Sequence, residues 1–224
     1  MTMLTIDALI WLGLHLGLSG TELRGVVIGR IGVRLFRTLF AAVALAVMVM
    51  LCRSYASAGM VLLWIAPGWL RGLLALAMLP AFVLFVASFR ANPTAAGGER
   101  FLGQEAHGIQ RVTRHPMMTS FAIWAAVHMI GNGDLAGLVF FGTFFITAAA
   151  GMPSIDRKTA ARDPAAWERL ARSTSILPFA AILAGRNRFV PAEIGWLAPA
   201  VGAALWAGML FFHRSLFGVA PVMF

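Results

Sequence analysis

The chain has 224 residues, of which 60% are hydrophobic and 12% charged, and its formal net charge is +9. Soluble domains average about 45–50% apolar and about 25% charged residues, so this composition excludes an ordinary soluble protein and predicts an integral membrane protein. The positive charge would suggest a nucleic-acid partner in a soluble protein. No aromatic and basic platform for nucleic acid is present, and we assign the charge to cytoplasmic loops and predict no nucleic-acid partner.

Six segments approach the roughly 17–25 apolar residues that cross a bilayer. In chain order they are 4–19, 35–51, 70–89, 116–131, 135–152 and 195–212. The stretch "MVLLWIAPGW" at 60–69 is too short to span and predicts an interfacial or re-entrant piece. We therefore predict an all-α, polytopic membrane helix bundle with about six transmembrane helices, forming one domain over 1–224. The first apolar run has no basic n-region before it and no small-residue cleavage site after it, and we expect it to be retained.

Basic residues are concentrated in three loops of this six-span arrangement. The loops 20–38, 90–115 and 153–194 hold fifteen of the eighteen Lys and Arg residues. They are alternate loops, so they lie on one side of the membrane, which the positive-inside rule makes the cytoplasmic side. The sequence therefore predicts a multi-pass protein of the inner (plasma) membrane with both termini on the non-cytoplasmic side.

Two connections have recognisable local chemistry. The "GNGD" sequence at 131–134 predicts a tight outer turn that makes the fourth and fifth spans a hairpin, with Asp134 either capping a helix or orienting a partner. In "DPAAWERLARSTSILPF", Asp163 is a candidate N-cap and Pro164 follows at the first helical position. This stretch predicts a short amphipathic helix, lying on the inner membrane surface or packing as a plain surface helix.

The histidines are the candidate cofactor ligands, and there are five of them: His15, His107, His115, His128 and His213. His15 and His128 lie inside predicted spans, where a neutral imidazole can either bind haem iron or donate to a neighbouring carbonyl. The one cysteine, Cys52, excludes an intramolecular disulfide and a Cys-based metal motif. His115 and His128 are thirteen residues apart and so face nearly opposite sides of one helix, about 20 Å apart along it. They are alternatives to each other as partners of His15.

A second group lies at the inner mouth of the fourth span. It predicts a site that binds an anion, namely haem propionates, a phosphate or a cofactor carboxylate, through Arg111, Arg114 and His115. The alternative is that these side chains simply anchor the helix at the membrane interface. His107 lies in a polar loop and is expected to be solvated. His213, at the outer end of the sixth span, is expected to be an interfacial histidine.

Several blocks resemble the NnrU family of bacterial membrane proteins. They are "VTRHPMM" at 112–118 and "AAVHMIGNGDL" at 125–135. Together with "GLHLGLSGTELR" at 13–24, "DRK" at 156–158 and "STSILPFAAILAGRN" at 173–187, they resemble the 15-cis-ζ-carotene isomerase branch of that family. The resemblance extends from about residue 10 to residue 190.

This resemblance implies a b-type haem with two axial histidines, which correspond by motif to His15 and His128. It also implies redox-dependent cis-to-trans isomerisation of the central 15-cis double bond of ζ-carotene or a similar polyene, with the ferrous state active. Both histidines would then be metal ligands and catalytic residues, and the partners would be membrane lipid and an apolar polyene. Aromatic side chains of the fourth and fifth spans would either wall a polyene slot or serve as helix packing: Trp124, Phe140, Phe141, Phe144 and Phe145.

Two other functions remain open at this point. A non-enzymatic haem-binding accessory protein, linked to nitrite or nitric-oxide respiration, would need the histidines but no substrate slot. The sequence "R-x-x-RHP" also resembles membrane methyltransferases, in which Arg114 and His115 would help to hold S-adenosylmethionine. Against that reading, Asp156 and Arg157 stand where those enzymes have paired glutamates, and the chain has only one tyrosine. The oligomeric state is not indicated by any pattern.

Overall fold

The structure, a computed structural model, describes residues 1–90, 92–94, 98 and 101–222. Five long helices form the body of the molecule: α3 (Val33–Ala56), α4 (Gly68–Ala87), α6 (Pro116–Asn132), α7 (Leu135–Arg162) and α11 (Leu197–Phe217). The chain begins with α1 (Thr2–Leu12), a π-helical turn over Gly13–Leu18 and α2 (Leu23–Ile31). Four short helices complete it: α5 (Ile109–Val112), α8 (Pro164–Ser173), α9 (Ala180–Leu183) and α10 (Pro191–Ile194).

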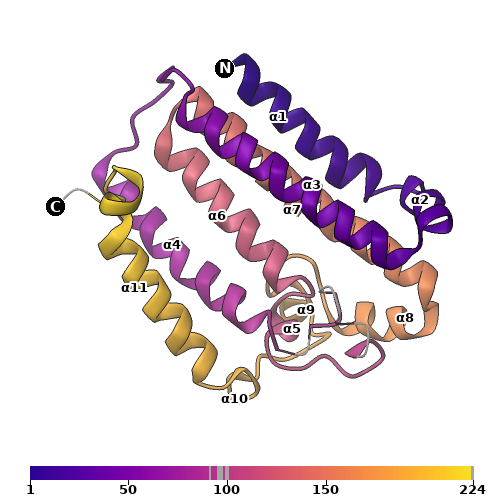
Figure 1. The fold of residues 1–224 in the computed structure, drawn as a ribbon. Helices are drawn as coiled ribbons and strands as arrows, with labels where there is room; N and C mark the ends of the chain where they lie inside the picture. Colours follow the sequence, from indigo (N-terminus) through magenta and orange to yellow (C-terminus); the bar gives the residue numbers. More distant parts are fainter. Residues whose placement is uncertain (91, 95–97, 99–100, 223–224) are drawn as a thin grey trace.

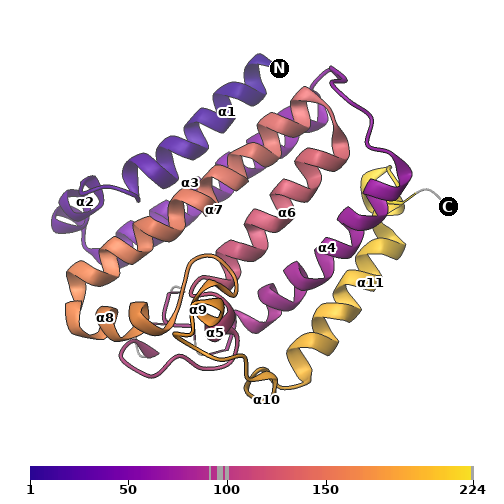
Figure 2. The ribbon, with the colours of Figure 1, turned by 180° about the vertical axis from the view of Figure 1, so that it is seen from behind.

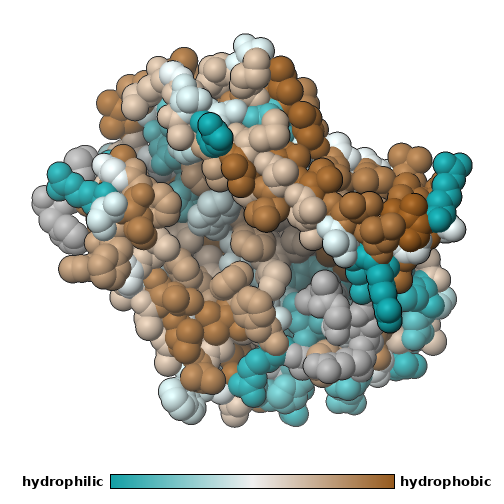
Figure 3. Space-filling model, in the orientation of Figure 1, coloured by the Kyte–Doolittle hydropathy of each residue, from teal (hydrophilic) through white to brown (hydrophobic). Residues whose placement is uncertain are grey.

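The long helices run side by side in a slab (Figure 1). Helix α1 packs against both α3 and α7, α6 lies between α7 and α4, and α11 forms the far edge against α4. Seen from behind, α7 covers α3 and the order is the same (Figure 2). The short helices α5, α8, α9 and α10 gather at one end of the slab, which is also where Figure 3 shows many polar side chains.

The six predicted spans are helical, but the predicted count of six is not confirmed. Among the described residues, four helices are long and apolar enough to cross a membrane, namely α3, α4, α7 and α11. The first predicted span is broken instead: the helix over Thr2–Leu18 meets α2 at a bend of 79°, and counting this pair as one span gives five. Helix α6 has 17 residues, at the lower end of the roughly 17–25 residues that cross a bilayer.

Two apolar clusters hold the slab together. The larger joins α1, α3, α6 and α7 through buried side chains such as Trp11, Leu51 and Phe141. The smaller joins α4, α5 and α11. At the α4–α11 contact, a Cβ on Gly202 would lie 2.8 Å from the Cα of Val83, so only glycine permits this close approach. Apart from the buried Ala198, the other residues of α11 are exposed or half-buried, as those of an edge helix in lipid can be.

The predicted tight turn between α6 and α7 is confirmed and is tied to the extended stretch before α4. Gly133 has φ +67°, and its carbonyl accepts bonds from the backbone N–H groups of Leu63 and Trp64. The indole of Trp64 donates to Ile130 O at 2.9 Å. Asp134 caps α7 by accepting from the N–H of Gly137 at 2.8 Å. The stretch 60–67 is thus a strap across the α6–α7 hairpin.

The predicted amphipathic helix is also confirmed, as α8. Asp163 accepts from the N–H of Ala166 at 3.0 Å, and Pro164 occupies the first turn. Leu170 is buried, whereas the Arg172–Glu168 pair on the other face is well exposed. Helices α7 and α8 therefore both begin at an Asp cap that the local sequence predicts.

Candidate functional site

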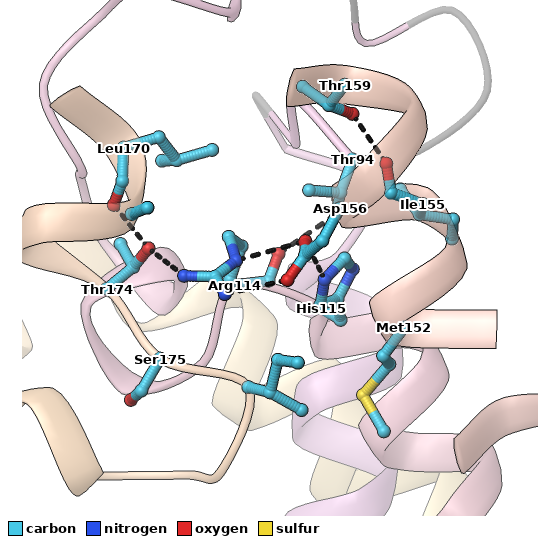
Figure 4. Close-up of polar contacts among 12 residues, drawn as sticks. Thr94, Arg114, His115, Met152, Ile155, Asp156, Thr159, Leu170, Thr174 and Ser175 are labelled. Carbon is cyan, nitrogen blue, oxygen red and sulfur yellow. Dashed lines mark hydrogen bonds and ion pairs between the residues drawn. The ribbon is translucent and has the colours of Figure 1, made fainter. Parts of the chain in front are cut away.

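The turn before α6 is built around Arg114. Its guanidinium donates to both carboxylate oxygens of Asp156, at 3.2 and 2.7 Å, and to Thr174 Oγ1 at 2.9 Å (Figure 4). Its backbone N–H donates to Ser175 O at 2.8 Å, and the Trp167 ring lies 4.7 Å from the guanidinium carbon. Arg114 thus joins the start of α6 to the C-terminal part of α7 and to the segment after α8.

His115 shares the same carboxylate. The side chain is 2% exposed, and its Nε2 lies 2.7 Å from Asp156 Oδ1 (Figure 4). A carboxylate oxygen only accepts, so Nε2 carries the proton. Among the described residues, Nδ1 of His115 is the one buried side-chain nitrogen or oxygen without a hydrogen-bond partner. An imidazole oriented by a carboxylate, with its second nitrogen unengaged, is chemically able to accept a proton or to bind a metal.

Arg111 is held by a different acid. Its guanidinium donates to both oxygens of Glu193, at 2.7 and 2.9 Å, and to Asn187 Oδ1 at 2.7 Å. The backbone N–H of Gly108 also donates to Glu193, at 2.8 Å. These hydrogen bonds, first of all that from Arg111, lower the pKa of Glu193 to about 2. The same pairing raises the pKa of Arg111.

The predicted anion contact at Arg111, Arg114 and His115 stays a prediction. Both guanidinium groups already pair with carboxylates of the chain, as does His115. The same carboxylate contacts engage the two side chains that a methyltransferase would use for its cofactor. Arg111 does line a cavity of about 440 Å³, whose wall includes three more arginines: Arg169, Arg172 and Arg186. An anion near Arg111 would enter from this cavity.

His15 lies in the π-helical turn that follows α1. Its Nδ1 is 3.0 Å from the carbonyl of Trp11, one turn earlier, and its ring stacks on the Trp11 indole at 4.0 Å. A carbonyl only accepts, so Nδ1 carries the proton and Nε2 holds the lone pair. The edge of Phe40, from α3, lies against the imidazole.

His128 repeats this arrangement on α6. Its Nδ1 is 2.7 Å from the carbonyl of Trp124, again four residues earlier, and its ring stacks on Phe141 at 4.7 Å. Metal-binding histidines commonly hold the non-ligating N–H on a carbonyl, which orients the ring and leaves the other nitrogen for the metal. His15 and His128 therefore both fit the role of iron ligand through Nε2.

Trp11 with His15, and Trp124 with His128, each form a W-x-x-x-H unit. Both units contact α7, but at different positions along its length. Phe144 contacts both Trp11 and Trp124, at 5.3 and 5.6 Å. The Trp11 indole donates to Thr147, whereas His128 stacks on Phe141. These two positions on α7 are about 9 Å apart along the helix, and His15 lies a further turn beyond Trp11. The structure thus joins the two units through Phe144 without bringing the two imidazoles to one level.

The predicted aromatic wall forms a packed cluster for the most part. Phe140 contacts both Phe141 and Phe144 edge to face, and Trp124 lies against Phe141 and Phe144. Phe145 is 38% exposed and points away from this cluster's core. Figure 3 shows the surface hollowed over α6, between apolar side chains on either side.

Two site features have no clear sequence signal. Asp156 is a buried acid that joins Arg114 and His115 across 42 and 41 positions. His213 of α11 lies with its ring centroid 6.4 Å from that of His128, although the sequence places it merely at an interface. His107 is exposed, as predicted: 65% of its side chain is accessible, and its Nε2 lies 3.8 Å from Glu193.

The fold and site define an all-helical protein with four to five candidate membrane-spanning helices among the described residues, with histidine–tryptophan pairs near two of its helices and a buried Arg–Asp–His group at one end. The chain belongs to the NnrU family, which matches residues 3–221. It is 29% identical over 194 residues to the chloroplastic 15-cis-zeta-carotene isomerase of Zea mays, covering 84% of this chain and 51% of that protein. It is 30% identical over 190 residues to the Arabidopsis thaliana protein of the same name, covering 80% and 50%. The chain thus spans about half the length of these relatives. No solved structure matches it.

Proposed function

We propose that this protein is a haem b-dependent membrane isomerase that converts the central cis double bond of ζ-carotene, or of a similar polyene, to trans in a redox-dependent reaction. The similarity to two 15-cis-zeta-carotene isomerases supports the reaction class. The observation that carries the cofactor assignment is the shared geometry of His15 and His128. Each holds Nδ1 on the carbonyl of a tryptophan four residues earlier and so offers Nε2 to iron.

The proposal gives the histidines and the apolar helix flanks separate roles. His128, between Phe141 and the α11 side, would bind iron, and His15 is the second imidazole that the sequence predicts. Bound haem would supply an iron centre that shares electron density with the polyene and so lowers the order of its central double bond. The apolar helix flanks would admit the polyene from the bilayer and exclude water from the reacting bond.

Arg114, Asp156 and His115 would keep the start of α6 in place. The Asp156 carboxylate fixes both neighbours, so the position of α6 relative to α7 depends on it. Since His128 is carried by α6, we assign this group a positioning role toward the iron site. The unengaged Nδ1 of His115 lies at the opposite end of α6 from His128, about 20 Å away along the helix.

The testing experiment has two stages. The detergent-purified protein, expressed with ample haem, is examined by absorption spectroscopy before and after reduction with dithionite. A Soret band with sharp α and β bands after reduction is expected, and a colourless protein would contradict the cofactor assignment. The reduced protein is then incubated with the 15-cis polyene under anaerobic conditions, and the isomers are separated by chromatography.

The second stage separates the two haem-based functions. The expected result is a product that is trans at the central bond, formed by the reduced but not by the oxidised protein. Full haem content with no isomerisation would instead favour the accessory role in nitrite or nitric-oxide respiration. His107→Ala is the matched control in both stages, because the side chain of that histidine is 65% exposed.

A further inference from the structure

The arginine-lined cavity lies at the end of the molecule where the short helices gather (Figure 1). Its volume of about 440 Å³ is within the range of roughly 300–1,000 Å³ that is usual for small-molecule sites. The charged residues of its lining are four arginines and one acid, Glu105. The arginines come from separate parts of the chain, namely Arg111 from α5, Arg169 and Arg172 from α8, and Arg186 from the turn after α9. The tertiary structure thus concentrates positive charge around one hollow.

Two of the four arginines are already paired with acids of the chain. Arg111 donates to both oxygens of Glu193, at 2.7 and 2.9 Å. Glu105, in the cavity wall, attracts the same guanidinium. Arg172 donates to Glu168 at 2.6 Å. These two arginines therefore contribute hydrogen-bond donors to the lining, but little charge that is not already balanced.

The other two arginines keep their charge for a ligand. Within the part of the chain that the structure describes, neither Arg169 nor Arg186 forms an ion pair. One nitrogen of Arg186, Nη1, donates to the carbonyls of Ala171, Arg172 and Thr174 at 3.1, 2.8 and 3.2 Å. These bonds hold the guanidinium at the C-terminal end of α8 and leave its charge without a counter-ion. Both side chains are exposed, so an anion can reach them.

The lining suits a phosphate group. Guanidinium groups bind phosphate oxygens through paired, charge-assisted hydrogen bonds. A phosphate presents oxygens in several directions, and here the arginines surround the cavity from α5, α8 and the turn after α9. Gln104, Ser173 and Asn187 also line the cavity and offer neutral polar groups beside the cations. Such groups fit the hydroxyls that a lipid headgroup carries next to its phosphate.

Exposed apolar side chains lie on the same stretch of chain as Arg186. Helix α9 is anchored through Ala181, which is fully buried, and the N–H of Phe179 donates to Val112 O at 2.8 Å. The large apolar side chains around α9 are nevertheless exposed: Leu177, Phe179, Leu183 and Phe189. Apolar side chains next to a group of cations are typical of a segment that lies at the surface of a bilayer. This combination favours a lipid over a soluble phosphate compound.

We infer that the cavity binds the phosphate group of an anionic membrane lipid, with Arg169 and Arg186 as the cations that contact it and the apolar side chains around α9 against the lipid. The loops that form the cavity belong to the basic ones that the positive-inside rule places on the cytoplasmic side, where anionic lipids give the membrane a negative surface. The inference involves neither haem nor a polyene, so its outcome is separate from that of the proposed function.

The test follows the unfolding temperature of the full-length protein in an uncharged detergent. Dihexanoyl phosphatidylglycerol, which is water-soluble and anionic, is titrated in parallel with dihexanoyl phosphatidylcholine and with inorganic phosphate. The anionic lipid is expected to raise the unfolding temperature most, and the effect should weaken at high salt. Arg169→Gln should raise the half-maximal lipid concentration by about tenfold, as expected for one lost charge-assisted hydrogen bond, and Arg169→Lys should do so less. Arg188→Gln is the matched control, because Arg188 is exposed but does not line the cavity.

Three results would overturn the inference. Equal effects of the two lipids would mean that the cavity does not select an anionic headgroup. An effect of inorganic phosphate as large as that of phosphatidylglycerol would make the ligand a free phosphate and not a lipid. The same titration curve for Arg169→Gln and Arg188→Gln would place lipid binding outside this cavity. Arg169 is the residue to change because no ion pair to the described chain depends on it, so the variant is expected to fold.

Discussion

Arg114 donates to both oxygens of Asp156, and this pair connects the turn before α6 to the C-terminal part of α7. Both residues are buried, at 7% and 8% exposure. His115 contacts the same carboxylate, so one acid holds two consecutive residues of the turn. The start of α6 is therefore fixed by an interaction between segments about 40 residues apart.

Asp156→Asn removes the negative charge and leaves the Arg114 guanidinium buried without its counter-ion. Breaking a buried pair costs about 3–5 kcal/mol, so we expect a marked fall in the thermal unfolding temperature in detergent. Glu168→Gln is the matched control, because its pair with Arg172 is well exposed and should contribute little. Equal unfolding temperatures for the two variants would contradict the structural role of Asp156.

Glu193 makes stability depend on pH in the acid range. Its pKa falls from 4.5 to about 2 in the folded chain because Arg111 and the Gly108 N–H bind the carboxylate. A lowered carboxyl pKa contributes stability that is fully present above pH 4.5 and is lost as the pH falls from 4.5 toward 2. Unfolding temperatures measured from pH 7 to pH 2.5 should therefore drop less steeply in Glu193→Gln than in the wild type. Parallel curves for the two proteins would exclude this contribution.

Gly133 is required by both its backbone angle and its surroundings. An added Cβ would lie 2.1 Å from Trp64 O, the carbonyl of the strap that crosses the hairpin. Gly133→Ala should thus lower the unfolding temperature by more than Gly185→Ala does. Gly185 has almost the same φ, +69°, but a Cβ there meets nothing within 4 Å, so this control measures the cost of the angle alone. No difference between the two variants would mean that the strap moves away freely.

Gly202 sets the distance between α4 and α11. Gly202→Ala would place a Cβ against the Val83 backbone, which cannot move aside as a flexible side chain can. We expect a lower unfolding temperature, because overpacking of this kind lowers the free energy of unfolding by about 1–3 kcal/mol. Gly208→Ala, on the same helix with open space around it, should be neutral or slightly stabilising. A destabilised Gly208→Ala with an unaffected Gly202→Ala would contradict this helix contact.

The sequence by itself determined the features that depend on local chemistry and on composition. Hydropathy placed the apolar helices, and the GNGD turn and the two Asp caps are as predicted because each involves residues within a few positions. The W-x-x-x-H spacing similarly implies the carbonyl contact of both histidines, since residues four apart are neighbours on a helix. Motif resemblance indicated the family, which the family match confirms.

Only the tertiary structure decided which distant side chains meet. Hydropathy measures length and polarity but not a bend, so the break after Leu18 was not predicted and six spans are not confirmed. Nothing in the sequence pairs Asp156 with Arg114, because one carboxylate can reach any cation that the helices bring within about 3 Å of it. His213 meets His128 for the same reason: the position of α11 against α4 depends on close packing at Gly202, and that packing places a ring from the end of the chain beside α6.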